Sequence, residues 1–431
     1  MHIHRVKILN FKGFASCEVE LDPRFNLFVG DNATGKTSFL DALSIALDSY
    51  FLGMKGVERP GGIDSSQVRA QEHRYSDRIS FEKQYPTRIE VEGTVLGRKV
   101  TWSRELSREG GRTNTAGTKK LSEISSHIDD LVRKQLNVDL PLVCSYGTER
   151  LWYEYKHNKS SRADSESRRW PSRFYGYRDC NVFVIQETAL LEWIKAEVLT
   201  SQQLGKETPA LSVTKKAIVA CVDGAESIYY DARIDDIVVV SKEHGHQLFR
   251  FLSDGQRIML TLIGDLVKRA VTLNPHHGLD VLDKTEGVVM VDELDLHLHP
   301  KWQRRVIHDL KRTFPSIQFI VTSHSPQLVG EALPNEIRIL EKGQAHRVPR
   351  SFGMDSNRAL EEVMDASSRN EKVKALLLEL SSFVEAENLP NAKRVLEDVA
   401  AKLGDDDPEV TGANTLINLL EMSHEEHSKG S

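Results

Sequence analysis

An eight-residue stretch near the N-terminus constrains the fold of this chain more than any other feature. Residues 30–37 have the sequence GDNATGKT, which fits the pattern G-x-x-x-x-G-K-[ST]. The apolar segment 25–29 before it predicts a buried strand, and residues 38–50 after it carry apolar side chains at helical spacing. A strand, a glycine loop and a helix together direct backbone N–H groups and a helix N-terminus toward a phosphate group. We therefore predict a nucleotide-binding loop rather than an ordinary glycine turn before a helix.

The side chains of this loop match the chemistry of ATP bound with Mg²⁺. Lys36 would place a positive charge against the phosphates, and the hydroxyl of Thr37 would be a ligand of Mg²⁺. The residues that we predict to bind ATP here are Gly30, Asn32, Gly35, Lys36, Thr37 and Ser38.

A second apolar segment ends in two carboxylates. Residues 287–291 are GVVMV, and Asp292 and Glu293 follow them. Buried parallel strands have this composition, and ligands bind at their carboxyl ends. Alone, the pattern fits acidic helix caps equally well. Together with the loop, it predicts that Asp292 holds Mg²⁺ and that Glu293 accepts a proton from, or orients, the attacking water.

Length and composition limit the class of protein. A chain of 431 residues exceeds the size at which one core keeps growing, so we expect two or three subdomains. No apolar stretch approaches the ~20 residues of a membrane helix, and residues 1–6 lack an apolar signal core, so we expect a cytoplasmic protein. The four cysteines show no C-x-x-C spacing and indicate neither zinc nor disulfides. The net charge of −6 argues against a uniformly basic nucleic-acid binder but permits a local basic patch.

Periodicity along the chain predicts a mixed α/β protein. Strands are predicted at 3–9, 16–21, 25–29, 87–95, 99–104, 141–146, 234–240, 247–252, 287–291 and 317–322. Helices are predicted at 38–50, 121–136, 255–272, 302–312 and, near the C-terminus, as a pair around 373–380 and 392–403 with a turn at 389–391. Residues 53–86, 107–119 and 157–169 are predicted to be loops, and the acidic segment after Gly404 a loose tail.

Three further motifs follow in a fixed order. Residues 252–257, LSDGQR, resemble the signature of ABC-type ATPases, and Leu294-Asp295 lies where that class has its D-loop. Residues 322–326, TSHSP, resemble the loop that carries the switch histidine. Each motif alone is weak evidence for a family. The order of the motifs along the chain, together with the glycine loop and the acidic strand, makes the chain similar to ABC-type ATPases.

Other segments narrow the resemblance. Residues 9–14, LNFKGF, resemble the opening of RecF- and SMC-related ATPases, and residues 293–300, ELDLHLHP, resemble AAA-domain proteins grouped with the OLD ATPases. Over roughly residues 1–420, including YGTERLW at 146–152, the chain resembles the ATPase subunits of Septu-type antiphage systems, the PtuA proteins.

The resemblance implies a P-loop ABC-type ATPase head, a mixed sheet with flanking helices, helical inserts and a C-terminal helical hairpin. The implied parts are 1–52 and 233–350 for the two portions of the head, 53–232 for an inserted lobe, and 351–431 for the helical region. It also implies a homodimer or higher oligomer in which two ATP molecules lie between facing heads. Ser253, Gly255 and Gln256 would then contact the ATP of the other subunit, and His324 would act with Glu293 in catalysis. The glutamine of the family's Q-loop has no clear counterpart, and Gln186 is only a guess.

Missing patterns suggest how such an ATPase would act. The sequence has no heptad stretch for an SMC-type arm, no acidic constellation for a Toprim nuclease and no H-N-H pattern. We therefore expect ATP hydrolysis here and nuclease activity only in a partner, an HNH-type subunit regulated by this sensor, with DNA or RNA as a further ligand. The alternatives are a RecF-like DNA-repair ATPase and, disfavoured by the long span between the glycine loop and the signature, a transporter cassette.

Three features have two interpretations. The aromatic and arginine side chains of 170–179 suit nucleic-acid stacking or, as we favour, subdomain packing. His297 and His299 suit a metal or, more commonly, packing. The apolar faces at 371–403 suit packing on the ATPase core, which we favour, or docking of a second subunit.

Overall fold

The structure is a computed structural model that describes residues 1–57, 61–76, 78–148, 172–180 and 187–429. The chain forms two compact units, Met1–Ala359 and Leu360–Ser431. None of the described helices is long and apolar enough to cross a membrane.

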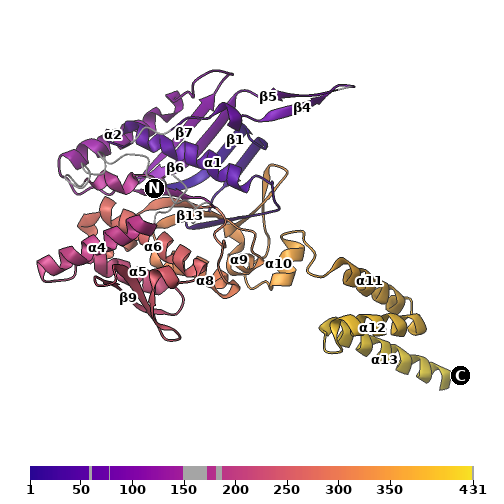
Figure 1. The fold of residues 1–431 in the computed structure, drawn as a ribbon. Coiled ribbons are helices and arrows are strands. Elements are labelled where there is room, and N and C mark those ends of the chain that lie inside the picture. Colours follow the sequence, from indigo (N-terminus) through magenta and orange to yellow (C-terminus); the bar gives the residue numbers. More distant parts are fainter. Residues whose placement is uncertain (58–60, 77, 149–171, 181–186, 430–431) are drawn as a thin grey trace. The chain divides into compact units, whose positions relative to one another are not determined.

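A six-stranded sheet with the order β15-β14-β3-β13-β12-β8 forms the centre of the first unit (Figure 1). Its strands are β3 (Phe25–Val29), β8 (Leu142–Tyr146), β12 (Gly287–Val291), β13 (Ile317–Thr322), β14 (Ile337–Glu341) and β15 (Gln344–Arg347). All neighbours pair in parallel except β15, which is antiparallel to β14. Every residue of β3, β8, β12 and β13 is buried, as expected when layers cover both faces of a parallel sheet.

A second, antiparallel sheet has the order β2-β1-β6-β7. Its strands are β1 (His2–Phe11), β2 (Phe14–Glu20), β6 (Thr87–Val95) and β7 (Arg98–Leu106). The β6–β7 hairpin predicted from the sequence is confirmed, and Gly97 turns it with φ 76°. The helix α1 (Lys36–Leu47) contacts both sheets and is buried along most of its length, with the Trp102 indole donating to the Ala46 carbonyl at 2.8 Å.

Further helices complete the described part of the first unit around the two sheets (Figure 1). They are α2 (Lys119–Arg133), α4 (Glu187–Leu204), α5 (Pro209–Cys221), α6 (Asp254–Leu273), α7 (Val281–Lys284), α8 (Pro300–Thr313), α9 (Pro326–Glu331) and α10 (Ser356–Glu362). A three-stranded meander accompanies them, formed by β9 (Ala225–Asp231), β10 (Asp236–Ser241) and β11 (Gly245–Leu248). The helices predicted at 255–272 and 302–312 are confirmed as α6 and α8.

The region 53–232, which the resemblance implied to be an inserted lobe, contributes strands to both sheets. β6 and β7 join the antiparallel sheet and β8 joins the central sheet, so much of this region belongs to the body of the first unit. The predicted loop 53–86 also contains a hairpin of β4 (Ala70–Arg74) and β5 (Ile79–Lys83). The residues of this hairpin are nearly all exposed; β4 shows no alternation of apolar and polar side chains, and in β5 only Ile79 and Phe81 alternate with polar residues, so the signal of a half-buried strand is short.

Phe174 and Tyr177 of the short helix η4 (Arg173–Tyr177) pack inside the first unit, whereas Tyr175 is exposed. Tyr177 is 2% exposed, and its ring lies 5.0 Å from the ring of Phe51 and 6.2 Å from that of Tyr50. Arg173 donates to the Leu273 carbonyl at 2.7 Å. These contacts support packing as the role of this segment; residues 157–169 and Trp170 lie outside the described residues.

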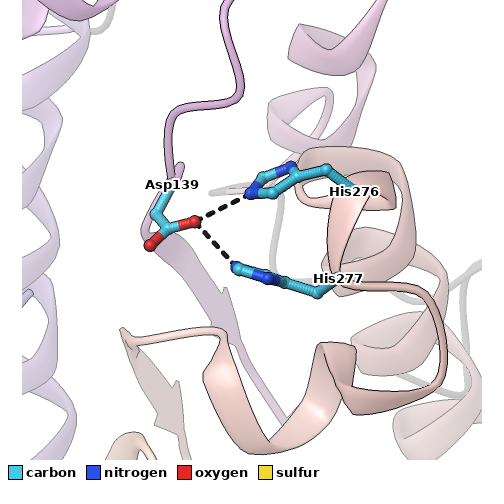
Figure 2. Close-up of side chains that lie close together, drawn as sticks. All are labelled: Asp139, His276 and His277. Atoms are coloured by element: carbon cyan, nitrogen blue, oxygen red, sulfur yellow. Dashed lines mark hydrogen bonds and ion pairs between the residues drawn. The ribbon is translucent and has the colours of Figure 1, made fainter.

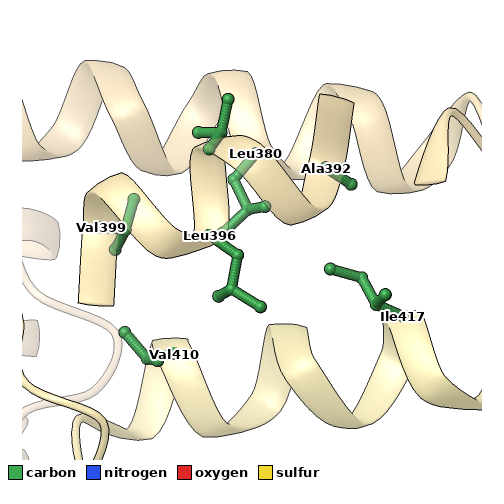
Figure 3. Packing of buried hydrophobic residues seen from close by; sticks show 7 residues of the cluster. Leu380, Ala392, Leu396, Val399, Val410 and Ile417 are labelled. Carbon is green, nitrogen blue, oxygen red and sulfur yellow. The ribbon is translucent and has the colours of Figure 1, made fainter. Parts of the chain in front are cut away.

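The second unit is a three-helix unit of α11 (Glu371–Glu385), α12 (Leu389–Leu403) and α13 (Pro408–Lys429). Its core consists of Leu380, Ala392, Val395, Leu396, Val399, Val410 and Ile417 (Figure 3). The prediction of a loose tail after Gly404 is therefore wrong, and so is the prediction that this region is a hairpin of two helices. The signal for α13 was weak because its first turns contain Thr411, Gly412 and Asn414, residues of low helix propensity. Residues 389–391, predicted to be a turn, form the first turn of α12, where proline is well tolerated.

Candidate nucleotide-binding site

The glycine loop connects the end of β3 to the start of α1. Gly30 and Gly35 adopt φ angles of 148° and 103°. A Cβ atom at Gly30 would lie 2.6 Å from the Leu340 carbonyl oxygen, and one at Gly35 would lie 2.8 Å from the Phe14 ring. Only glycine satisfies both the backbone conformation and this space, so the loop depends on these two residues.

Lys36 lies inside the loop. Its side chain is buried, and its ammonium donates to the carbonyl oxygens of Gly30 at 2.7 Å and Asp31 at 2.8 Å. Burial lowers the pKa of Lys36, while the carboxylates of Asp292 and Glu293 act in the opposite direction. An ammonium has three protons, so it can donate a further bond to an anion that reaches the loop.

Thr37 faces the acidic end of β12. The Thr37 hydroxyl donates to Asp292 Oδ2 at 2.8 Å, and Asp292 is 5% exposed. Mg²⁺ prefers six oxygen ligands at 2.0–2.1 Å, which places neighbouring ligand oxygens ~2.9 Å apart. The Thr37 hydroxyl oxygen and Asp292 Oδ2 already have the spacing that two ligands of one Mg²⁺ require.

Thr322, the last residue of β13, positions both acids. Its hydroxyl donates to Asp292 Oδ1 and accepts the backbone N–H of Glu293 at 2.7 Å. The N–H of Leu294 donates to the Thr322 carbonyl at 2.9 Å. Sequence reasoning missed this role; the signal was a hydroxyl at the end of the strand predicted next to the acidic one.

Glu293 has a left-handed backbone conformation with φ 49°. Such a conformation costs a non-glycine residue about 1–3 kcal/mol and persists where surrounding bonds determine it. Here the bonds from the Glu293 and Leu294 N–H groups to Thr322 hold it. The half-buried Glu293 side chain therefore leaves the sheet directly after Asp292, at the carboxyl edge where the glycine loop also lies.

The signature residues lie at the start of α6. Ser253 and Gln256 form a capping box, in which the Ser253 N–H donates to Gln256 Oε1 at 3.1 Å and the Gln256 N–H to Ser253 Oγ at 3.4 Å. A Cβ atom at Gly255 would lie 2.7 Å from the His297 carbonyl oxygen, so the start of α6 packs closely on the segment after Glu293. Ser253 is exposed, and its bonds are local ones to Gln256.

His324 lies in the loop between β13 and α9, at the same edge of the sheet as Asp292 and Thr322. Two residues that sequence reasoning missed hold this loop. Ser325 Oγ donates to Gln303 Oε1 at 2.7 Å, and Gln303 Nε2 donates to the Leu298 carbonyl at 2.9 Å. The loop that carries half-buried His324 is thereby tied to the segment that follows Glu293.

Comparisons with known proteins agree with this geometry. A family model described as "AAA domain" matches residues 5–207, and one described as "AAA domain, putative AbiEii toxin, Type IV TA system" matches residues 227–330. Together they contain the glycine loop, the signature, the acidic strand and the histidine loop. The chain is an AAA-domain ATPase of the ABC type.

Curated relatives of this protein include retron ATPases, Septu proteins and the DNA replication and repair protein RecF. The Retron Ec83 probable ATPase of Escherichia coli is 24% identical over 97% of this chain and 86% of its own length. The Septu protein PtuA of Bacillus thuringiensis is 36% identical over 100 residues, 23% of this chain and 25% of its own length. The likeness to PtuA is thus found over a much shorter part of the chain than the roughly 1–420 predicted. Among solved structures, an SMC head domain from Thermotoga maritima matches 82% of this chain with 15% identity and a TM-score of 0.42.

Two remaining predictions have different outcomes. Gln186, the guess for the Q-loop glutamine, lies outside the described residues. His297 and His299 are both exposed, and His299 Nδ1 accepts the Lys301 N–H at 3.3 Å as the cap of α8. This contact gives His299 a structural role in starting a helix, but the exposure of both side chains does not match the packing that we favoured over metal binding.

Proposed function

We propose that this ATPase binds ATP with Mg²⁺ at the carboxyl edge of its central sheet and hydrolyses it between two facing heads. We further propose that the nucleotide state regulates a partner nuclease in an antiphage defence complex. The observation that supports nucleotide chemistry best is the hydrogen bond between Thr37 and Asp292, which joins the glycine loop to the acidic strand at Mg²⁺ ligand spacing.

Each residue of the site has a defined task in this proposal. Lys36, the loop N–H groups and the N-terminus of α1 bind the phosphates, with Asn32 and Ser38 in the same loop. Thr37 and Asp292 hold Mg²⁺, which neutralises phosphate charge. Glu293 orients the attacking water and accepts its proton, and His324 contacts the same region from the β13 loop.

The exposed signature supports a dimer. Ser253 caps α6 and faces solvent, and Gly255 and Gln256 complete the first turn, where a helix N-terminus attracts anions. In a head-to-head dimer this turn would meet the γ-phosphate bound by the other subunit. One chain would then supply only half of each hydrolysis site.

The proposal of a nuclease partner rests on the relatives and on the second unit. The relatives include a retron ATPase and a Septu protein, and the sequence itself lacks an H-N-H pattern. α13 exposes Leu416, Leu419 and Met422 by 53–63%, an apolar stripe that a partner subunit would cover. The proposed nuclease is of HNH type and would act on DNA or RNA.

Lys36→Ala is expected to weaken ATP binding, because the loop loses a buried ammonium within reach of the phosphates. Calorimetry with ATP and Mg²⁺ on purified wild type and variant measures the effect. Lys372→Ala, at an exposed position in α11, is the matched control and should bind ATP like the wild type. Equal ATP affinity of Lys36→Ala and the wild type would contradict a nucleotide site in this loop.

Charges on the α13 stripe should release the partner without affecting ATP binding. The double variant Leu416→Glu/Leu419→Glu is expected to lose co-purification with the product of the neighbouring gene, the proposed nuclease partner, since carboxylates cannot be buried cheaply in an apolar interface. Asn414→Glu adds charge to an exposed polar position of the same helix and serves as the control. Retention of the partner by the double variant would exclude this stripe as the docking surface.

A further inference from the structure

A cluster of three potential metal ligands lies away from the nucleotide site. Asp139 precedes β8, and His276 and His277 lie in the short helix η6 (Pro275–Asp280) that follows α6 (Figure 2). Asp139 Oδ1 lies 2.9 Å from His276 Nε2 and 2.7 Å from His277 Nε2. Because Asp139 is at the amino end of β8, the cluster is at the opposite edge of the central sheet from Asp292.

Buried contacts hold the two backbone segments of this cluster together. Asn274, fully buried, accepts the Leu140 N–H at 2.8 Å and donates to the Leu140 carbonyl at 2.9 Å. Arg173 donates to the Leu273 carbonyl at 2.7 Å and also to the Val138 carbonyl. The residues on both sides of Asp139 are therefore tied to those just before His276, so the three side chains converge without a ligand to gather them.

The ligand atoms at the centre of the cluster are of the kinds that zinc binds. The two imidazole nitrogens and the carboxylate oxygen all lie within 4.8 Å of one another. Zinc binds such nitrogen and oxygen atoms at 2.0–2.2 Å, so tetrahedral ligands stand ~3.3 Å apart. Small movements of the three side chains would bring their atoms to this spacing.

We infer that Asp139, His276 and His277 form a zinc-binding site with a fourth position open to water. The exposed fractions support that open position, because Asp139 is 54% exposed while the two histidines are 14% and 15% exposed. Zinc there would cross-link the end of the signature helix α6 to the start of β8. This role is independent of the proposed nucleotide chemistry.

To test the site, the untagged full chain is first treated with a chelator. It is then dialysed to equilibrium against zinc in the presence of excess Mg²⁺. Mass spectrometry of the metal should find one zinc per wild-type chain. His276→Ala, His277→Ala and Asp139→Asn should each bind zinc at least ~10-fold more weakly, since even the loss of an outer-sphere partner costs ~10–100-fold. All four cysteines are buried, which limits their competition for the metal.

The control variant is His244→Ala/His246→Ala, which removes two exposed histidines around β11 and should keep the full zinc content. His277→Gln retains an N–H donor for Asp139 and serves if an alanine variant fails to fold; it too should lose zinc. With Co²⁺ in place of zinc, the wild type should show visible absorption that these ligand variants lack. If the wild type takes up no more zinc than His277→Gln, the proposal is overturned. The cluster would then be a hydrogen-bonded contact only.

Discussion

Replacing Glu293 by glutamine is expected to preserve ATP binding and to reduce ATP turnover by ~10²–10⁴-fold, the usual cost of losing a general base. Glutamine has nearly the size of glutamate, and the backbone N–H of residue 293 still donates to Thr322. The left-handed turn after Asp292 should therefore persist. Thr37 and Asp292 would still hold Mg²⁺. The missing function is only that of the carboxylate, which orients water and accepts its proton.

Phosphate release under saturating ATP measures this turnover, and calorimetry on the same preparations measures ATP affinity. Glu397→Gln, an exposed position of α12, controls for the substitution and should hydrolyse ATP at the wild-type rate. Wild-type turnover by Glu293→Gln would assign the base to another residue. Loss of ATP binding would instead show that Glu293 supports the site structurally.

Ser253→Arg is expected to abolish turnover while leaving ATP binding to the glycine loop intact. A long cation at this exposed cap would obstruct the surface that we propose to face the other subunit's γ-phosphate. The cap takes no part in the bond of Lys36 to Gly30 or of Thr37 to Asp292. The decisive measurement mixes Ser253→Arg with Lys36→Ala protein. Each mixed dimer contains one site with an intact loop and an intact signature, so random exchange should restore about a quarter of the wild-type sites.

Mixing requires exchange of subunits, so labelled wild-type chains should first show that exchange occurs under the conditions used. Ser253→Arg mixed with Ser253→Arg/Lys36→Ala double variant is the negative control, because no intact site can form. Exchange without any recovery of activity in the first mixture would contradict hydrolysis between two subunits. Activity of Ser253→Arg alone would show that the signature is not needed.

The sequence predicted most accurately those features that local patterns encode. The glycine loop, the apolar runs of β3, β12 and β13, and the hairpin around Gly97 were recognised because strand periodicity and glycine requirements act over a few neighbouring residues. The meeting of Thr37 with Asp292 was also predictable, because parallel strands present their carboxyl ends at one edge. α13 and the exposed β4–β5 hairpin were missed because their local sequence patterns are weak.

Only the tertiary structure decided which distant residues meet. Thr322 holds Asp292 and Glu293 because β13 lies between β3 and β12, and no local pattern encodes that strand order. Asp139 meets His276 and His277 across more than 130 residues of sequence, through an asparagine that binds the backbone of Leu140. The sequence alone predicted the chemistry of the candidate nucleotide site, since motif residues carry that prediction. The support of that site, and the proposed zinc site, depend on long-range packing and could be identified only from the folded chain.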